Sequence, residues 1–303
     1  MRCVITLQPL PDDFHQRSLA VRHFIMRNTR TILVAIGCLL HLAVSVNASQ
    51  AEDYGAALTQ RLGIPAESLE IDGKPAFILL PPEAKRQTPQ PWIMYAPALP
   101  AYPDEHEAWM HRQFVDAGIA VAGIDAGEAY GSPQGRAACS ALYDELVKKR
   151  GFAPQPCLLG RSRGGLWVTN WAVDNPDKVA GIAGIYPVFD LRAYPTLEKA
   201  APAYELSVDE LQSQLDAHNP VARIAPLIKA RTPMFMVHGD VDEVVPLESN
   251  SAAIAEKFQA AGAGDCVTVK VIKGQGHNFD ESFFKCQELV DFAIKQAREG
   301  AKD

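Results

Sequence analysis

Three polar residues in the second half of the chain have the types that hydrolysis by a serine nucleophile requires. Ser162 lies within GRSRGG, Asp242 within VHGDVDEVVP and His277 within KGQGHNF. A serine attacks a carbonyl carbon efficiently when a histidine takes its proton, and the histidine needs a carboxylate that holds its ring. The three residue types therefore predict nucleophilic catalysis through an acyl-enzyme, with Ser162 as the nucleophile, His277 as the base and Asp242 as the orienting acid.

The residues around Ser162 predict the sharp turn that such a nucleophile occupies. The apolar residues 157–159 indicate a strand that ends at Gly160, and a helix is expected from Gly164. A nucleophile on a tight strand-to-helix turn has a strained backbone, so the residues two positions to either side must be small. Gly160 and Gly164 meet this requirement. An ordinary turn serine in a glycine-rich loop is the alternative interpretation.

The segments that must position these residues alternate between apolar runs and helical spacing. Two strand-like runs within residues 68–80 meet at Asp72-Gly73, a strong hairpin signal. Beyond this hairpin we expect a mainly parallel sheet with helices on both faces, which is an α/β fold. The expected strands are at residues 92–96, 119–124, 157–160, 179–186, 233–239 and 266–272, and the expected helices at 105–118, 134–150, 164–175, 249–261 and 281–298.

A proline-rich segment at residues 187–232 interrupts this alternation. It contains short helical pieces such as SVDELQSQLDAHN. We expect a small helical insertion after the sixth strand, over the carboxyl edge of the sheet, because open α/β sheets bind ligands at that edge.

The first 51 residues differ from the rest and predict a secretory leader. Two arginines precede the apolar run TILVAIGCLLHLAVSV, and the small residues NASQA follow it. The run is shorter than the roughly 20 residues that a membrane span needs, so a permanent anchor is the weaker interpretation. Because acidic residues and prolines precede Met26, we expect translation to begin there. Cleavage after Ala48 or Ala51 would send the protein to the periplasm or the extracellular medium.

Residues 52–303 are expected to form a single catalytic domain, since a chain of this length can build one well-buried core. The formal net charge of the whole chain is −7, which argues against a nucleic-acid partner because such binding needs a basic surface. Export would permit disulfides, but the number and spacing of the four cysteines beyond residue 51 leave their pairing open. These are Cys139, Cys157, Cys266 and Cys286. The oligomeric state is also left open.

The order Ser162, Asp242, His277, with each residue just beyond a predicted strand, resembles the α/β-hydrolase superfamily. HGDVDEVVP followed by GHNF is similar to the C-terminal half of its dienelactone-hydrolase and prolyl-oligopeptidase-like branches. In that pattern the acid is the aspartate that precedes x-x-Val-Pro, which favours Asp242 over Asp240. Asp240 is then expected to shape the loop through an Asx-turn. The resemblance implies an α/β-hydrolase fold that needs neither a metal nor an organic cofactor.

The same resemblance implies an oxyanion hole of two backbone N–H groups. One belongs to Arg163, the residue after the nucleophile. The other comes from the loop after residues 92–96, where this chain reads APA in place of the usual His-Gly-x. Proline has no N–H, so the second donor is expected at Ala98, with Leu99 as the alternative.

Arginines on both sides of the nucleophile are the least expected feature of the turn. Arg163 makes it similar to the Gly-Cys-Ser-Arg turn of glucuronoyl esterases, whose arginine helps to hold the oxyanion, and Arg161 takes the place of their cysteine. We hypothesise that Arg163 contributes charge to the oxyanion or to an acidic group of the substrate, the alternative being a salt bridge at the helix start. Arg161 is another candidate for substrate binding. So are Glu128 and Tyr130 in the glycine-dense loop at 124–136, although a simple connecting loop fits that stretch equally well.

Other residues with reactive side chains fit structural roles better. His106 and His111 are five positions apart, which places them on different sides of a helix and argues against a shared zinc ion. The DVDE stretch lacks the glycine and the final acid of a calcium loop. Trp167 and Trp171, one helical turn apart, are expected in the core.

Together these observations predict an exported serine hydrolase of carboxylic esters, with a small-molecule or carbohydrate-linked ester as substrate. The first alternative is a prolyl-oligopeptidase-like peptidase or amidase on the same triad. Such peptidases have an aromatic residue where this chain has Arg163, and an N-terminal propeller for which the segment before residue 92 is too short. The second alternative is a non-catalytic binding protein. Activity is expected to fall at low pH as His277 is protonated.

Overall fold

The computed structural model describes residues 54–302 of the chain. The predicted leader within residues 1–51 and the predicted start at Met26 lie outside the described residues, so export stays a prediction. No helix within residues 54–302 combines the length and apolar character that crossing a membrane requires.

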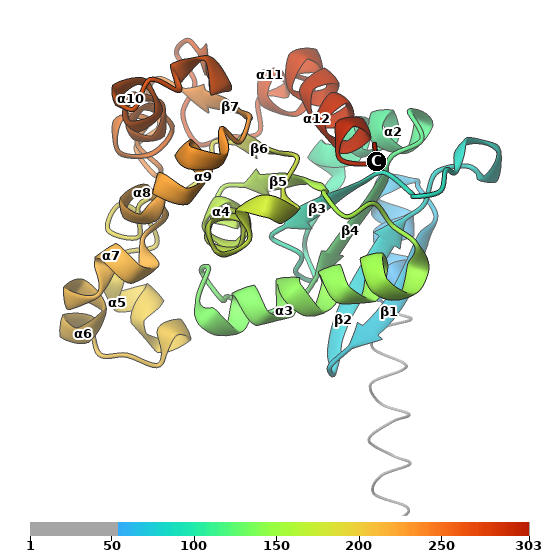
Figure 1. Cartoon of the computed structure of the whole chain (residues 1–303), viewed down its shortest axis with the longest axis horizontal. Coiled ribbons are helices and arrows are strands. Elements are labelled where there is room, and N and C mark those ends of the chain that lie inside the picture. The colour runs from blue at the N-terminus through green and yellow to red at the C-terminus, as the bar shows by residue number, and fades with distance from the viewer. Residues whose placement is uncertain (1–53, 303) are drawn as a thin grey trace, which may run out of the picture. The chain divides into compact units, whose positions relative to one another are not determined.

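The hairpin predicted at Asp72-Gly73 forms one edge of the central sheet (Figure 1). β1 (Ala66–Ile71) and β2 (Lys74–Leu79) pair in antiparallel register. Both turn residues have positive φ, 51° at Asp72 and 72° at Gly73, as a two-residue type I′ turn requires.

Six further strands complete an eight-stranded sheet in the order β1-β2-β4-β3-β5-β6-β7-β8. β2 pairs antiparallel with β4, and every pair from β4 across to β8 is parallel. The added strands are β3 (Trp92–Ala96), β4 (Ala120–Ile124), β5 (Cys157–Arg161), β6 (Gly181–Ile185), β7 (Met234–Gly239) and β8 (Val267–Ile272). The four strands from β3 to β6 are buried at every position, which explains their continuous apolar runs. The predicted α/β fold is confirmed.

Helices cover both faces of this sheet (Figure 1). α2 (Ala108–Asp116) and α12 (Gln287–Glu299) contribute to the core on one face. α3 (Pro133–Asp144), α4 (Gly164–Asp174) and α10 (Ala253–Ala260) contribute to the core on the other.

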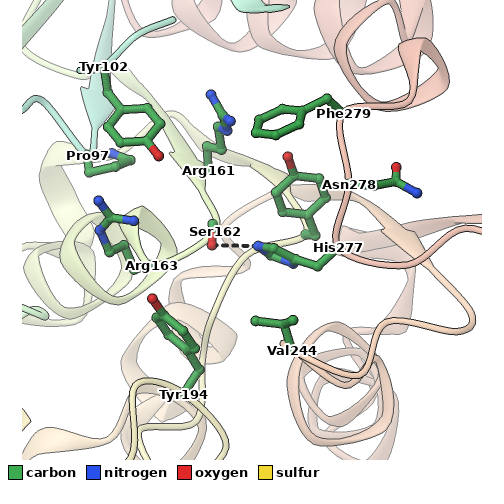
Figure 2. Close-up of a pocket in the computed structure, with 11 residues that line it drawn as sticks. Pro97, Tyr102, Arg161, Ser162, Arg163, Tyr194, Val244, His277, Asn278 and Phe279 are labelled. Carbon is green, nitrogen blue, oxygen red and sulfur yellow. Dashed lines mark hydrogen bonds between the residues drawn. The ribbon is translucent and has the colours of Figure 1, made fainter. Parts of the chain in front are cut away.

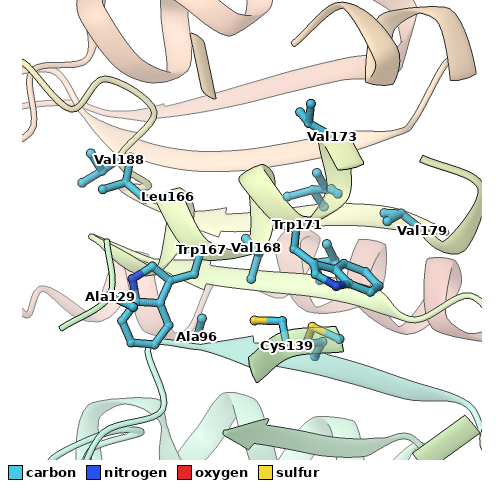
Figure 3. Close-up of a cluster of buried hydrophobic side chains, with 14 of the residues drawn as sticks. Ala96, Ala129, Cys139, Leu166, Trp167, Val168, Trp171, Val173, Val179 and Val188 are labelled. Carbon is cyan, nitrogen blue, oxygen red and sulfur yellow. The ribbon is translucent and has the colours of Figure 1, made fainter. Parts of the chain in front are cut away.

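Trp167 and Trp171 of α4 are buried in the second of these cores, as expected (Figure 3). The indole N–H of Trp171 donates to Ser140 Oγ over 3.0 Å, so its one polar atom is satisfied. These rings therefore support the sheet beneath the nucleophile turn rather than offering a surface to substrate.

The single helix predicted at residues 281–298 is divided in two, so that prediction was wrong in detail. α11 (Glu281–Phe284) is capped by Lys285, and Cys286 adopts an extended backbone (φ −70°, ψ 98°) before α12 begins. Phe284 packs edge-on against Tyr186, with the ring centroids 6.0 Å apart. Phe284 of the short helix therefore lies against the residue that directly follows β6.

The helical insertion after the sixth strand is confirmed. Between β6 and β7 the chain forms only short helices, because prolines recur along this segment and restrict helix continuation. These helices are α5 (Leu197–Ala200), α6 (Val208–Ser213), α7 (Leu215–His218), α8 (Pro220–Arg223) and α9 (Ala225–Ala230).

Candidate active site

Ser162 lies on the strand-to-helix turn between β5 and α4, with a positive φ of 50°. This left-handed conformation is strained for a residue with a side chain. The turn is held from both sides, because Ser162 N–H donates to Ile185 O over 2.9 Å and Ser162 O accepts from Val188 N–H over 2.9 Å. A Cβ on Gly164 would lie 2.1 Å from Ala96 O, so only glycine permits this approach to β3.

The structure brings Ser162, His277 and Asp242 into one chain of hydrogen bonds, and Figure 2 shows the bond between Ser162 and His277. Ser162 Oγ is 2.9 Å from His277 Nε2, and His277 Nδ1 is 2.8 Å from Asp242 Oδ2. A carboxylate can only accept, so Nδ1 carries the proton and Nε2 is left to accept the serine hydroxyl. Each residue follows a different parallel strand, namely β5, β7 and β8. This connectivity is the one that activates a serine nucleophile.

Asp242 is held as a carboxylate by its surroundings. Burial raises its pKa, but hydrogen bonds from His277 and from the N–H of Val245 outweigh that effect and keep the pKa below its usual value. Asp242 Oδ1 accepts from Val244 N–H over 3.0 Å and from Val245 N–H over 2.8 Å. These bonds fix the acid while Oδ2 faces the histidine.

Asp240 contacts the loop before His277 rather than its ring. Its Oδ1 accepts from Gly274 N–H over 2.6 Å, and its Oδ2 lies 3.3 Å from Lys273 Nζ. The Asx-turn expected at Asp240 was wrong, because the carboxylate that accepts the N–H two residues onward is that of Asp242. Asp240 instead joins the loops that follow β7 and β8.

His238, at the end of β7, contacts the loop that carries Asp242 and helps to hold it in place. Its Nε2 donates to Val245 O over 2.8 Å, and its Nδ1 accepts from Ser251 Oγ over 2.8 Å. Burial lowers the pKa of His238, so the ring is neutral beside Asp242, with Nε2 3.6 Å from Asp242 Oδ2. It therefore positions the loop without competing as a cation for the carboxylate.

Ser162 and His277 open into a pocket of about 170 Å³ (Figure 2). The ring of Tyr186, the residue after β6, lies 4.2 Å from that of His277 between centroids. The remaining lining residues are mostly aromatic or cationic: Pro97, Tyr102, Arg161, Arg163, Tyr194, Val244, Asn278 and Phe279. None of the lining residues is an aspartate or a glutamate.

The side chain of Arg161 lines the pocket, but its positive charge is already paired with two carboxylates that lie outside the pocket lining. Its Nη1 donates to Asp104 Oδ2 and to Glu107 Oε2, both over 2.7 Å. Tyr95 also donates its hydroxyl to Glu107, over 2.9 Å. The guanidinium carbon lies 5.0 Å from the ring centroid of Tyr102. Arg161 was predicted as a candidate for substrate binding, but its guanidinium is held mainly by these contacts with other side chains of the protein.

Arg163 extends along the pocket from the start of α4. Its Nε lies 2.9 Å from Glu128 Oε2, so the salt bridge that was the alternative hypothesis is present. Its side chain also lines the pocket, which leaves a role toward substrate open. Glu128 and Tyr130 do not line the pocket themselves, and Tyr130 O accepts from the Tyr204 hydroxyl over 2.8 Å. The glycine-dense loop therefore connects the insertion to Arg163.

The two residues predicted to donate their N–H groups to the oxyanion, Arg163 and Ala98, lie in different surroundings. Arg163 is the residue that directly precedes α4, where backbone N–H groups lack partners within the helix. Ala98 is fully buried and forms a bridge with Asp125. Pro97 and Tyr102 are the residues of this loop that line the pocket. The assignment of Arg163 and Ala98 as donors stays a prediction.

Several lining residues escaped the sequence reasoning, although two carried a signal. Tyr186 directly follows a parallel strand at the edge where α/β sheets bind ligands, and Phe279 is two residues from His277. Tyr102 and Tyr194 lie in irregular segments, where spacing carries no information about which way a side chain points.

The rings of His106 and His111 lie in different surroundings. The ring of His106 stacks on Phe279, with centroids 4.3 Å apart, whereas His111 is fully buried against Tyr95. Within residues 54–302 no group of three or more His, Cys, Asp or Glu side chains is arranged to hold a metal ion. The four cysteines beyond residue 51 are all free thiols.

Comparison with known proteins yields one sequence family and many similar folds. The sequence profile of the prolyl oligopeptidase family matches residues 139–297, just over half of the chain. No curated protein matches the sequence.

Three solved structures illustrate the similarity in fold. MPT51 (FbpC1) from Mycobacterium tuberculosis has a TM-score of 0.61 at 14% identity, over 77% of this chain and 99% of that protein. Est1E from Butyrivibrio proteoclasticus has a TM-score of 0.55 at 19% identity, over 77% and 99%. Puromycin hydrolase has a TM-score of 0.55 at 19% identity, over 78% of this chain. The present chain spans only 39% of the length of puromycin hydrolase.

Proposed function

The chain belongs to the prolyl oligopeptidase family of the α/β-hydrolase superfamily, and from this membership we propose that it is a serine hydrolase of carboxylic esters. The observation that carries the proposal is the hydrogen-bonded chain from Ser162 through His277 to Asp242, with lengths of 2.9 and 2.8 Å, at the wall of a pocket. A serine so connected loses its proton to the imidazole as it attacks a carbonyl carbon.

In the proposed reaction, Ser162 Oγ attacks the ester carbonyl while His277 Nε2 takes the hydroxyl proton. Asp242 holds the imidazole and stabilises the imidazolium, and the N–H of Arg163 with a second N–H, expected at Ala98, receives the oxyanion. His277 then gives the proton to the departing alkoxide, which leaves an acyl-enzyme. A water molecule, deprotonated by His277, releases the carboxylic acid and restores Ser162.

Two features of the pocket indicate the kind of ester that it would accept. A pocket of about 170 Å³, walled by arginine and aromatic side chains, admits a small acyl group. The rings and hydroxyls of Tyr102 and Tyr194 suit a partner that is apolar on its faces and polar at its edge, so we favour a carbohydrate-linked ester. The match to a peptidase family supports amide hydrolysis on the same triad as the second candidate.

Labelling with a fluorophosphonate probe tests the proposal. The wild-type protein is expected to be labelled and Ser162→Ala is not. A panel of aryl acetates, uronate esters and aminoacyl-anilides then separates the candidates, because turnover of anilides alone would establish the amidase. A folded wild-type protein that resists the probe and turns over nothing would favour the binding-protein alternative.

We also propose that the protein is exported, on the strength of the short apolar run at residues 31–46. Expression of the full chain should yield a mature protein whose N-terminal sequence begins after Ala48 or Ala51. An intact leader on the accumulated protein would contradict export.

A further inference from the structure

The pocket wall carries positive charge beside the nucleophile. Apart from His277, its only titratable lining groups are two arginines, Arg161 and Arg163, and the tyrosines. A concave site lined by one sign of charge favours ligands of the opposite sign. The question is which of the two cations is available to a substrate.

Arg161 is not available. Its side chain is 4% exposed, and its Nη1 already donates to Asp104 and Glu107. A substrate carboxylate would add a third negative group around a single buried cation, which is unfavourable in a poorly solvated site.

Arg163 is available to a substrate, because a substrate carboxylate can replace its present ion-pair partner. Its ion-pair partner Glu128 has a side chain that is 47% exposed, whereas that of Arg163 is 18% exposed. Ion pairs with a solvated partner contribute little to stability, so Glu128 can give way at small cost. The guanidinium carbon of Arg163 lies 5.1 Å from the ring centroid of Tyr102, and this contact holds the cation in the pocket when Glu128 leaves.

The position of Arg163 indicates which part of the substrate it meets. Arg163 and His277 lie on opposite sides of Ser162, with Tyr194 of the insertion on the same side as Arg163 (Figure 2). His277 must face the leaving-group oxygen, because it protonates that oxygen. The side of Arg163 and Tyr194 is therefore the side of the acyl group.

We propose that the substrate is a monoester of a dicarboxylic acid, whose free carboxylate binds the guanidinium of Arg163 in place of Glu128. This inference rests on the proposed ester hydrolysis. Attack by Ser162 breaks the acyl–oxygen bond and releases the alcohol, and water then breaks the acyl-enzyme bond, so that one ester and one water give one alcohol and one dicarboxylic acid. Without substrate, Arg163 pairs with Glu128, whose side chain lies outside the pocket lining.

The test compares monomethyl glutarate with methyl pentanoate, which have equal chain length and differ in the terminal carboxylate. Acid release, followed in a pH-stat, should give a kcat/KM about tenfold or more higher for the charged ester, since hydrogen bonds to charged groups are the stronger ones. Arg163→Gln should abolish this preference and Arg163→Lys should keep part of it. The matched control Arg192→Gln, which removes an exposed arginine paired with Asp190, should leave the preference intact. Glu128→Gln should lower KM for the charged ester.

A second measurement uses the expected product. Glutarate should slow fluorophosphonate labelling of the wild-type protein and should not slow it in Arg163→Gln. Equal turnover of the two esters, an equal loss for both in Arg163→Gln, or labelling that glutarate does not slow would overturn this inference while leaving the esterase proposal standing. A wild-type protein that is neither labelled nor active would overturn the esterase proposal itself.

Discussion

The guanidinium of Arg161 donates a hydrogen bond of 2.7 Å to the carboxylate of Glu107, and both side chains are buried. Arg161 directly precedes the nucleophile, and Glu107 directly precedes α2. Burial raises the pKa of Glu107, and Arg161 beside it opposes that rise. The pair therefore connects the nucleophile turn to a helix on one face of the sheet. Because both side chains are buried, each charge depends on the other for its stabilisation.

Removing one member of this pair should be costly. Arg161→Met is expected to lower the free energy of unfolding at pH 7 by about 3–5 kcal/mol, because Glu107 is left charged and buried. The loss should be smaller at pH 5 than at pH 7, because burial, no longer opposed by Arg161, raises the pKa of Glu107 in the folded variant and favours its neutral form as the pH falls. Urea unfolding at the two pH values measures both effects.

Arg231→Met provides the matched control for that experiment, because it removes an arginine from an exposed pair with Asp265, 2.6 Å apart. It should leave stability nearly unchanged. If Arg161→Met proved equally mild, Glu107 would have to be neutral in the folded protein and the interpretation of the pair as ionic would be wrong.

The triad predicts a steep and non-additive loss of activity. Ser162→Ala or His277→Ala should lower kcat by about 10⁶-fold, and combining them should cost little more, because the residues act as one unit. Asp242→Asn should lower kcat by about 10⁴-fold through the wrong histidine tautomer. Steady-state kinetics on the best ester of the panel provide the values.

The neighbouring aspartate provides the control for the acid. Asp240→Asn should retain most activity, since the Asp240 carboxylate accepts from Gly274 N–H and does not contact His277. A loss in Asp240→Asn comparable to that in Asp242→Asn would mean that loop geometry, and not the carboxylate on the histidine, limits the rate.

The sheet was predictable because its central strands are buried on both faces. A run such as WIMYA or CLLG has no charged residue to accommodate, so the apolar stretch and the strand nearly coincide. The division between α11 and α12 was not predictable, since helical spacing continues across residues 281–298. The break places Phe284 against Tyr186, which is about 100 residues earlier in the chain, and no local spacing indicates such a contact.

The meeting of Ser162, His277 and Asp242 was predictable for a related reason, since loops that follow the carboxyl ends of parallel strands lie at one edge of the sheet. The surroundings of the two arginines were not. Asp104 and Glu107 are separated from Arg161 by 57 and 54 positions, and no local spacing specifies such a contact. A salt bridge at Arg163 could be anticipated from the helix start, but its partner Glu128 could not.

The close approach of the nucleophile turn to β3 predicts that Gly164 tolerates no side chain. In Gly164→Ala the new Cβ would lie 2.1 Å from Ala96 O, so the backbone must shift, at a cost of about 1–3 kcal/mol or more. The same shift would move Arg163 N–H relative to the loop after β3, where the second oxyanion donor is expected. We therefore expect kcat to fall further than the loss of folded protein alone would explain. Gly127→Ala is the control for activity: a Cβ there meets nothing within 4 Å, but φ is +67°, so this variant should lose stability through backbone strain and keep its kcat. Unchanged kcat in Gly164→Ala would show that this approach is not needed.

The buried His111 predicts that the protein loses stability in acid. Burial, with the nearby charge of Arg161, lowers the pKa of His111 to about 3, and neither ring nitrogen has a hydrogen-bond partner in the described part of the chain. The unfolded chain binds the proton near pH 6.5 and the folded chain does not. Stability from this residue is therefore complete above that pH and falls by about 1.4 kcal/mol per pH unit as the pH is lowered toward 3.

His111→Phe should remove that slope, because a phenyl ring fits between Tyr95 and Phe114 and binds no proton. Free energies of unfolding in guanidinium chloride at pH 7, 6, 5 and 4 should diverge progressively between the wild-type protein and the variant. At pH 7 the two should differ least, because His111 is neutral there in both the folded and the unfolded chain. Parallel curves for the two proteins would show that His111 is protonated or solvated in the folded state, against its burial beside Arg161.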